Sequence, residues 1–397
     1  MPEPVEPVQP FTLTAEALRD RRGVKWHRFE PDVLPAWVAD MDFRVPPAVE
    51  RAIARVTEQG DYGYAHREGP ESVGWAFTRR MRDRFGWDAD PELTVEVTDL
   101  IQGLTACLLA FSGPDDGVVV QTPIYPPFLQ TISDVGRRRV ENPLGDDGSR
   151  FVLDVPGLEA VVDERTRVLL VCNPHNPTGR VLSRAELSAL GRLAVERDLV
   201  IVSDEIHCDL VYPGLRHVPL GALGGEIAAR TVTMNSATKG FNIPGLRCGV
   251  LHFGSADLLA RFQRAIPGRL LGRPSCIGVD ATVAAWREGQ PWLDRVLEVL
   301  ASNRGVVARW AAGQPGVRHY SPEATFLAWL DFTGAGLPSE PHDFFLSEAR
   351  VGLNRGGDFG ELGTCCARLT FGTSPEILRA VLDRMSSALD GVHAGAG

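Results

Sequence analysis

The chain has 397 residues, 44% of them hydrophobic, which is enough to bury a large core and to form two domains. Its formal net charge is −10 and no basic run stands out, which argues against nucleic acid and anionic membranes as partners. No apolar run is long enough to span a membrane and no secretory leader opens the chain, so we expect a cytoplasmic enzyme. The seven cysteines lack disulfide and metal-ligand spacing, which predicts buried free thiols.

Short apolar runs alternate with amphipathic stretches along most of the chain. Residues 1–10 are rich in Pro and Glu and are predicted to be a disordered tail. A helix is predicted at 183–197, where Ser183 and Glu186 can form a capping box. The alternation predicts a mainly parallel α/β sheet, whose ligands bind beyond the carboxyl ends of the strands. The predicted strands are 118–121, 168–172, 199–203, 231–234 and 247–253.

The pattern changes after about residue 290. A long helical segment at 291–311 is followed by strand-like runs at 325–332 and 366–371, and by a final helix at 375–389. This order predicts a second, smaller α+β domain. We assign residues 45–290 to a large α/β domain, and residues 11–44 and 291–397 to the small domain.

Lysine is rare in this chain. Only Lys25 and Lys239 are lysines among the 41 basic residues, and the rest are arginines. Arginine stays protonated and cannot form a Schiff base, whereas lysine can lose its proton and attack a carbonyl. Lys239 lies in the polar segment NSATKGF after a predicted strand, so it is the candidate nucleophile. Lys25 has no such setting and is predicted to be structural.

Four segments occur in a characteristic order: NPHNPTG at 173–179, SDEIH at 203–207, NSATKGFNIPGLRCG at 235–249 and CARL at 366–369. Their order and spacing resemble the fold-type-I pyridoxal-phosphate (PLP) enzymes of the class I/II aminotransferase superfamily, over about residues 15–390. The resemblance implies that PLP is the cofactor and that Lys239 binds it as a Schiff base. It also implies that Lys239 then moves the proton at the substrate Cα.

The resemblance assigns further contacts to PLP and to an amino-acid substrate. Asp204 would stabilise the protonated pyridine nitrogen, and Asn176 would bind the phenolate oxygen of the ring. Tyr125 would stack on the ring, while His207 either contacts the same oxygen or only packs. Arg368 would bind the substrate α-carboxylate. The expected phosphate ligands are Ser236, Arg247 and the segment Gly103, Leu104 and Thr105, which is predicted to open a helix at 104–111.

Further motifs narrow the resemblance to one branch. WVADMDF at 37–43, YGY at 62–64, DEIH and FNIPGL are similar to the MalY/PatB group of cystathionine β-lyases and related C–S lyases. That group implies β-elimination, which releases pyruvate, ammonia and a thiol. It also implies a homodimer in which Tyr64 crosses into the site of the neighbouring subunit.

Three positions depart from this branch. Arg247 is typical of aminotransferases, Gly240 stands where Ser or Thr is commoner, and Thr370 follows the Arg–Leu pair in place of Asn. These departures leave an aminotransferase, or a specialised enzyme of secondary metabolism that acts on a cysteine conjugate, as alternatives. We do not expect a non-enzymatic regulator, because the residues for the cofactor are all present.

Overall fold

The computed structural model describes residues 11–395, so the predicted tail at 1–10 lies outside the described residues. Its centre is a seven-stranded sheet in which the neighbours from β9 to β4 run parallel. Strand β10 runs antiparallel to both of its neighbours. The predicted mainly parallel sheet is therefore confirmed. The strand order is β2 (Thr94–Val97), β10 (Gly249–Phe253), β9 (Thr231–Asn235), β8 (Val200–Asp204), β7 (Thr166–Cys172), β3 (Gly117–Val120) and β4 (Arg138–Glu141).

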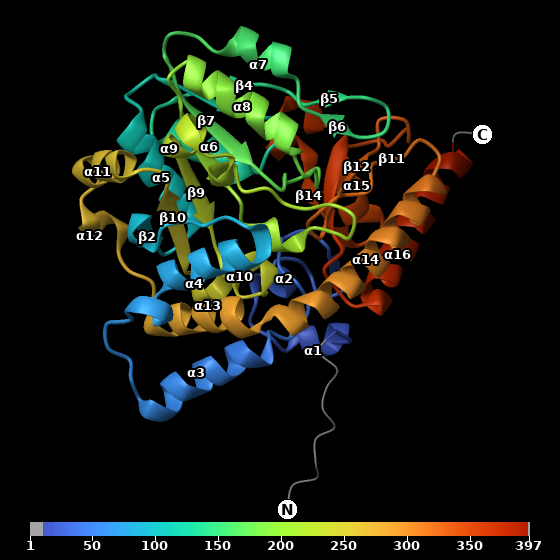
Figure 1. The fold of residues 1–397 in the computed structure, drawn as a ribbon. Helices are drawn as coiled ribbons and strands as arrows, with labels where there is room; N and C mark the ends of the chain where they lie inside the picture. The colour runs from blue at the N-terminus through green and yellow to red at the C-terminus, as the bar shows by residue number, and fades with distance from the viewer. Residues whose placement is uncertain (1–10, 396–397) are drawn as a thin grey trace, which may run out of the picture.

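Helices cover both faces of this sheet (Figure 1). Because successive side chains of a strand point to opposite faces, Val118 and Val120 of β3 join one hydrophobic cluster and Val119 joins another. The first cluster includes residues of α5 (Leu100–Phe111), α6 (Pro126–Asp134) and α11 (Ala256–Ala265), and the second includes residues of α7 (Val155–Val161) and α8 (Arg184–Glu196). The capping box of Ser183 and Glu186 begins α8 as predicted.

A second, antiparallel sheet is formed late in the chain. Its order is β11 (Arg318–His319), β12 (Leu327–Asp331), β15 (Cys366–Thr370) and β14 (Asn354–Arg355). The long helices α14 (Gln290–Ala312) and α16 (Pro375–Gly395) lie side by side next to it (Figure 1). The N-terminal strand β1 (Leu34–Pro35) pairs with β13 (Val351–Gly352), so the first and last parts of the chain meet. The predicted strands and helices after residue 290 are confirmed.

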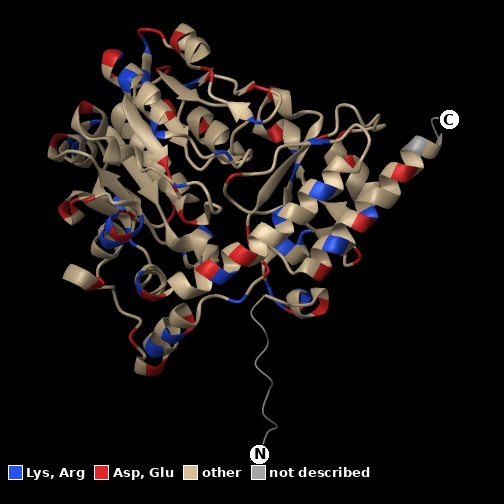
Figure 2. Ribbon diagram, turned by 45° about the vertical axis from the view of Figure 1, so that its right-hand side comes forward, with Lys and Arg blue, Asp and Glu red and all other residues tan. Residues whose placement is uncertain are grey.

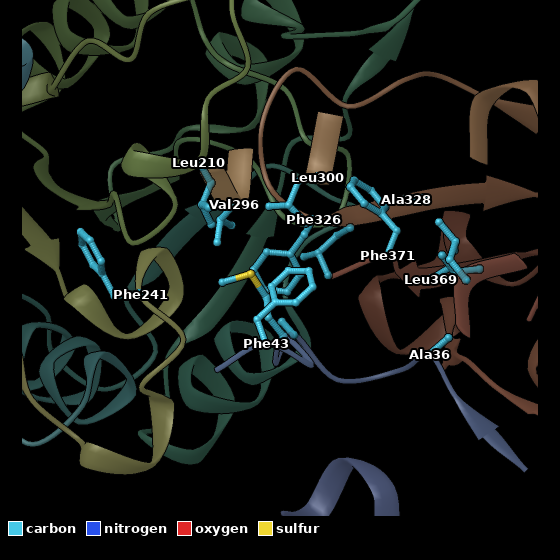
Figure 3. Packing of buried hydrophobic residues seen from close by; sticks show 14 of the residues in the cluster. Ala36, Phe43, Leu210, Phe241, Val296, Leu300, Phe326, Ala328, Leu369 and Phe371 are labelled. Atoms are coloured by element: carbon cyan, nitrogen blue, oxygen red, sulfur yellow. The ribbon is translucent and has the colours of Figure 1, made fainter. Parts of the chain in front are cut away.

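One hydrophobic core joins the two sheets. Its largest cluster includes Phe43 near the N-terminus, Phe241 beyond β9, Leu300 of α14 and Phe326 before β12 (Figure 3). This cluster crosses the predicted boundaries at residues 45 and 290. The division into two domains therefore stays a prediction, although the two sheets fall within the predicted ranges.

The remaining helices and strands are α1 (Ala15–Arg19), α2 (Val24–His27), α3 (Pro47–Gln59), α4 (Val73–Arg80), α9 (Gly225–Ala229), α10 (Ala237–Gly240), α12 (Gly268–Leu271), α13 (Cys276–Glu288), α15 (Pro341–Glu348), β5 (Gly145–Asp146) and β6 (Phe151–Val152). Within residues 11–395, no helix combines the length and the apolar composition needed to cross a bilayer. Acidic and basic residues are interspersed along the helices (Figure 2). All seven cysteines are free; Cys365 is exposed and Cys276 half-buried, whereas the others are buried as predicted.

Candidate active site

A cavity of about 490 Å³ opens where β7, β8 and β9 end. In a parallel sheet the carboxyl ends of the strands share one edge, and ligands bind beyond it. The cavity collects most of the residues predicted to bind the cofactor, although they are distant in sequence. The predicted residues that line it are Tyr125, Asn176, Asp204, His207, Ser236, Lys239 and Arg247.

Lys239 is a half-buried amine that lines the cavity. It lies on the short helix α10, and its Nζ donates a hydrogen bond of 2.7 Å to the carbonyl oxygen of Ala39. Burial lowers the pKa of Lys239 to about 8, and Arg368 adds to this effect, while Asp40 opposes it. A larger fraction of the amine is therefore neutral at physiological pH, which is the form that attacks a carbonyl carbon.

Asp204 ends strand β8 and lines the same cavity. Its Oδ1 accepts a hydrogen bond of 3.0 Å from the Ile206 N–H. Burial raises the pKa of Asp204 to about 7, although the hydrogen bond from Ile206 and the charge of Lys239 oppose the rise. A cationic partner would favour the ionised form of this carboxyl group and offset the effect of burial on its pKa.

Arg368 lies next to Asn176 and does not itself line the cavity. Its Nη1 donates to Asn176 Oδ1 at 2.9 Å, and its Nη2 donates to Asn354 Oδ1 at 2.5 Å. Its buried Nε has no hydrogen-bond partner among residues 11–395. Burial lowers the pKa of Arg368 to about 10. The guanidinium thus contacts only neutral acceptors, and a carboxylate would complete its hydrogen bonds.

The start of α5 corrects a prediction. The helix begins at Leu100, with Asp99 as N-cap, rather than at residue 104. Gly103, Leu104 and Thr105 therefore lie in its second turn and do not line the cavity; the Gly103 N–H and the Thr105 hydroxyl donate to the carbonyl oxygens of Asp99 and Ile101. Gly103 serves packing instead, because a Cβ there would lie 2.8 Å from Leu251 of β10.

The cavity still offers donors for a phosphate. Leu100 and Ile101 line it at the first turn of α5, where backbone N–H groups have no helical acceptor. Ser236 caps α10, and its hydroxyl donates to the Cys248 carbonyl oxygen at 2.6 Å. Arg247 lines the same region and forms an ion pair with Asp99. This arrangement combines a helix N-terminus, a hydroxyl and a guanidinium, as an anion requires.

His207 and Tyr125 complete the wall of the cavity. Burial lowers the pKa of His207 to about 3, so its ring is neutral, and its buried Nδ1 has no partner in the described part of the chain. Tyr125 packs edge-on against Phe128, with ring centroids 5.5 Å apart. Both rings face a cavity that has room for a planar aromatic ligand.

Tyr64 does not reach this cavity. It is 96% exposed and lines a separate hollow, with Tyr62 and residues 268–276. The structure of one chain therefore does not bring Tyr64 to Lys239. Its predicted role requires a second chain.

Some contacts of the site were not predicted from the sequence. Asn354 and the Trp37 carbonyl oxygen both accept from Arg368, and Asp99 binds Arg247. Asn354 lies in a short edge strand without any motif, so no sequence signal marks it. Asp99 carries a signal that could have been used, because Asp is a preferred N-cap.

The charged groups of the cavity match the groups of PLP. Asp204 is buried and Lys239 half-buried, and neither forms an ion pair among residues 11–395; Ser236, Arg247 and the start of α5 form the anion site. PLP has a pyridine nitrogen that can carry a proton, an aldehyde and a phosphate. An acid, an amine whose pKa is lowered and an anion site are the complements of these three groups, so the residues present fit the cofactor.

Comparison with known proteins identifies the family. Residues 38–385 match the model of the aminotransferase class I and II family, so the chain belongs to this family. Cystathionine beta-lyase PatB of Bacillus subtilis is 34% identical, over 93% of this chain and 97% of the relative. The crystal structure of OvoB is 37% identical with a TM-score of 0.89, over 94% of this chain and 97% of the other. The PLP-bound C–S lyase of Staphylococcus hominis is 28% identical with a TM-score of 0.86, over 93% and 96%. The predicted resemblance is confirmed.

Proposed function

We propose that this chain is a PLP-dependent C–S β-lyase that cleaves cystathionine or another S-substituted cysteine. The observation that carries the proposal is the Lys239 amine with its lowered pKa, which shares one cavity with Asp204 and lies near Arg368. The name of the relative PatB and the PLP-bound C–S lyase of Staphylococcus hominis support it. Both match nearly the whole chain.

The cavity residues would hold the cofactor in a fixed orientation. Asp204 would stabilise a protonated pyridine nitrogen, and Asn176 would bind the phenolate oxygen of the ring. Tyr125 would stack on the ring, and the unpartnered Nδ1 of His207 has a hydrogen bond to offer. The phosphate would bind Ser236, Arg247 and the backbone N–H groups of Leu100 and Ile101.

Arg368 and Lys239 would act on the substrate. The guanidinium of Arg368 would bind the α-carboxylate, exchanging neutral acceptors for a charged one. When bound, PLP supplies the electron sink that makes the proton at Cα acidic. Lys239 Nζ would take this proton, after which the Cβ–S bond breaks and its electron pair leaves on sulfur as a thiolate, which takes up a proton to give the thiol. With one water consumed, the remaining fragment gives pyruvate and ammonia.

A substrate test separates this function from transamination, which the description of the family also suggests. Purified enzyme with PLP should release pyruvate and homocysteine from L-cystathionine without any keto acid. A strict need for a keto-acid acceptor would contradict the lyase and favour an aminotransferase. A panel of S-substituted cysteines would then rank the leaving thiols.

We also propose that the enzyme is a homodimer in the cytoplasm. The exposed Tyr64 ring beside an open hollow supports a second copy at this surface. The seven free cysteines fit a reducing compartment.

A further inference from the structure

A second cavity, also of about 490 Å³, lies next to the first. We call it the N-terminal cavity, because residues between Leu18 and Ile53 form most of its wall and residues 242–246 close it. The contacts assigned above to PLP and to the substrate α-carboxylate use none of these side chains.

The two cavities share a wall. Ala39 lines the first cavity and Asp40 lines the second, and their Cα atoms are separated by about 3.8 Å as neighbours in the chain. Pro244 lines both cavities. Lys239 Nζ lies 2.7 Å from the Ala39 oxygen, and Lys239 and Asp40 are close enough to shift each other's pKa, so the N-terminal cavity adjoins the place where the Cα proton would be removed.

Four of the six charged side chains that line this cavity form ion pairs. Lys25 pairs with Asp42 at 2.7 Å, and Arg44 pairs with Glu50 at 2.9 Å. Arg21 and Asp40 differ, because their side chains form no hydrogen bond or ion pair with any of residues 11–395. The cavity therefore presents one free cation and one free anion.

The free carboxylate is costly where it stands. Burial raises the pKa of Asp40, even though Lys25 and Lys239 lie close enough to oppose the rise. A cationic ligand group would compensate part of this desolvation. The wall that carries Asp40 is fixed, because the Asn242 side chain donates to the carbonyl oxygens of Met41 and Phe43 and accepts from the Met41 N–H.

We propose that the N-terminal cavity binds a zwitterionic amino-acid head on the leaving thiol, with its ammonium group at Asp40 and its carboxylate at Arg21. The inference rests on the proposed lyase function and names its substrate class: thioethers of cysteine whose sulfur carries a second α-amino acid. Cystathionine is the simplest such compound, because a short methylene linker joins its sulfur to the distal head. A small apolar leaving group would leave both charges of the cavity unused.

The test compares two substrates in the holoenzyme. L-Cystathionine carries the distal head, and S-methyl-L-cysteine lacks it, so the ratio of their kcat/KM values reports on the N-terminal cavity alone. In Asp40→Asn and Arg21→Gln this ratio should fall about 10-fold, the effect of losing one hydrogen bond to a charged group. Arg22→Gln is the matched control, since Arg22 is the exposed neighbour of Arg21 and does not line the cavity; its ratio should stay at the wild-type value.

The outcomes separate this inference from the proposed function. If the wild type cleaves both compounds and the ratio moves in neither variant, the subsite is wrong while the lyase stands. An equal loss on both substrates in Asp40→Asn would place Asp40 in the common chemistry and also overturn the subsite. If the wild type cleaves S-methyl-L-cysteine but does not cleave cystathionine, the subsite is wrong as well. If the wild type cleaves neither compound, the lyase function itself fails. Thermal melting of each variant holoenzyme confirms that it is folded.

Discussion

Burial acts on two groups of opposite charge in one cavity. It lowers the pKa of Lys239 to about 8 and raises the pKa of Asp204 to about 7, so each group is shifted toward its neutral form. A neutral amine is what imine formation needs. Asp204, in contrast, must be ionised to stabilise a protonated pyridine nitrogen. The cofactor itself would supply the cation that keeps Asp204 charged.

Lys239→Ala should abolish turnover and remove the absorption band of the lysine-bound cofactor, because the variant has no amine at this position. PLP would then be retained only by non-covalent contacts. The absorption spectrum after dialysis, and borohydride labelling followed by peptide mapping, measure the effect. Labelling of Lys25, which is buried against Asp42, would contradict the assignment.

The pKa of Asp204 predicts how stability of the apoenzyme depends on pH. Its folded-state pKa of about 7 exceeds the ordinary value of 3.8, so the folded state holds the proton more tightly. The stabilisation is present at low pH and is lost as the pH rises through about 7. The free energy of unfolding of the wild-type apoenzyme, measured relative to that of apo Asp204→Asn, should fall by roughly 3 kcal/mol between pH 5 and pH 8.

Urea unfolding of both apoproteins at the two pH values measures this difference. Added PLP should reduce it, because a pyridinium would favour the charged carboxylate. Parallel stability curves for the two apoproteins would contradict the raised pKa of Asp204.

The sequence allowed some site residues to be predicted and concealed others. Lys239 was identifiable because lysine is rare here, and Asp204 because a carboxylate directly follows a buried strand. Asn354 becomes a partner of Arg368 only through the pairing of β14 with β15, which no local pattern encodes. Gly103 misled the prediction of the phosphate loop, because a glycine required for helix–strand packing looks like one required at a helix start.

At the scale of elements, the end of β8 is held by a buried His–Glu pair. The side chains of Glu205 and His217 are both 0% exposed, and Oε2 of Glu205 lies 2.9 Å from Nε2 of His217. The other carboxylate oxygen accepts from the Ser203 hydroxyl and the Leu220 N–H, each at 2.9 Å. These contacts tie the strand that carries Asp204 to the loop around residue 217.

His217→Ala should destabilise the holoenzyme by roughly 3–5 kcal/mol, because it leaves a buried carboxylate with fewer partners. The double variant His217→Ala/Glu205→Gln should lose less unfolding free energy than the two single variants lose together, because it no longer has an uncompensated buried carboxylate. Urea unfolding measures both effects. His342→Ala is the control: His342 lies beside Asp343, whose side chain is 48% exposed, and its loss should cost less than about 1 kcal/mol. Equal losses for His217→Ala and His342→Ala would contradict a role for burial.

Element prediction succeeded where burial leaves a mark in the sequence. Strands of a parallel sheet are covered on both faces and appear as continuous apolar runs, so β7, β8 and β9 were predicted to within two residues at each end. The direction of β10 could not be predicted, because an apolar run looks the same in either direction. The two-residue strands β1, β13 and β14 are too short to show any periodicity.

In the molecule as a whole, the cavity of one chain lacks Tyr64, which was predicted to act at the site. Tyr64 is 96% exposed and Leu270 is 67% exposed, and both belong to segments around a hollow of about 970 Å³. Large exposed side chains beside an open hollow are typical of interaction surfaces. A second copy that covers this hollow could place its own Tyr64 at the cavity of Lys239.

Mixing two inactive variants tests this arrangement. Lys239→Ala and Tyr64→Ala should each be nearly inactive as homodimers. In a mixed dimer, the intact Lys239 of one subunit meets the intact Tyr64 of the other, so one of the two sites is restored. If random exchange makes half of the dimers mixed, activity should recover to about one quarter of the wild-type value. Sedimentation confirms the dimer, and Lys239→Ala mixed with Asp204→Asn is the control, because both of these residues belong to the same chain's cavity while Tyr64 stays intact. That control should stay inactive, since each cavity of the mixed dimer still lacks either Lys239 or Asp204. Recovery in neither mixture, with exchange demonstrated, would show that Tyr64 does not act across the interface.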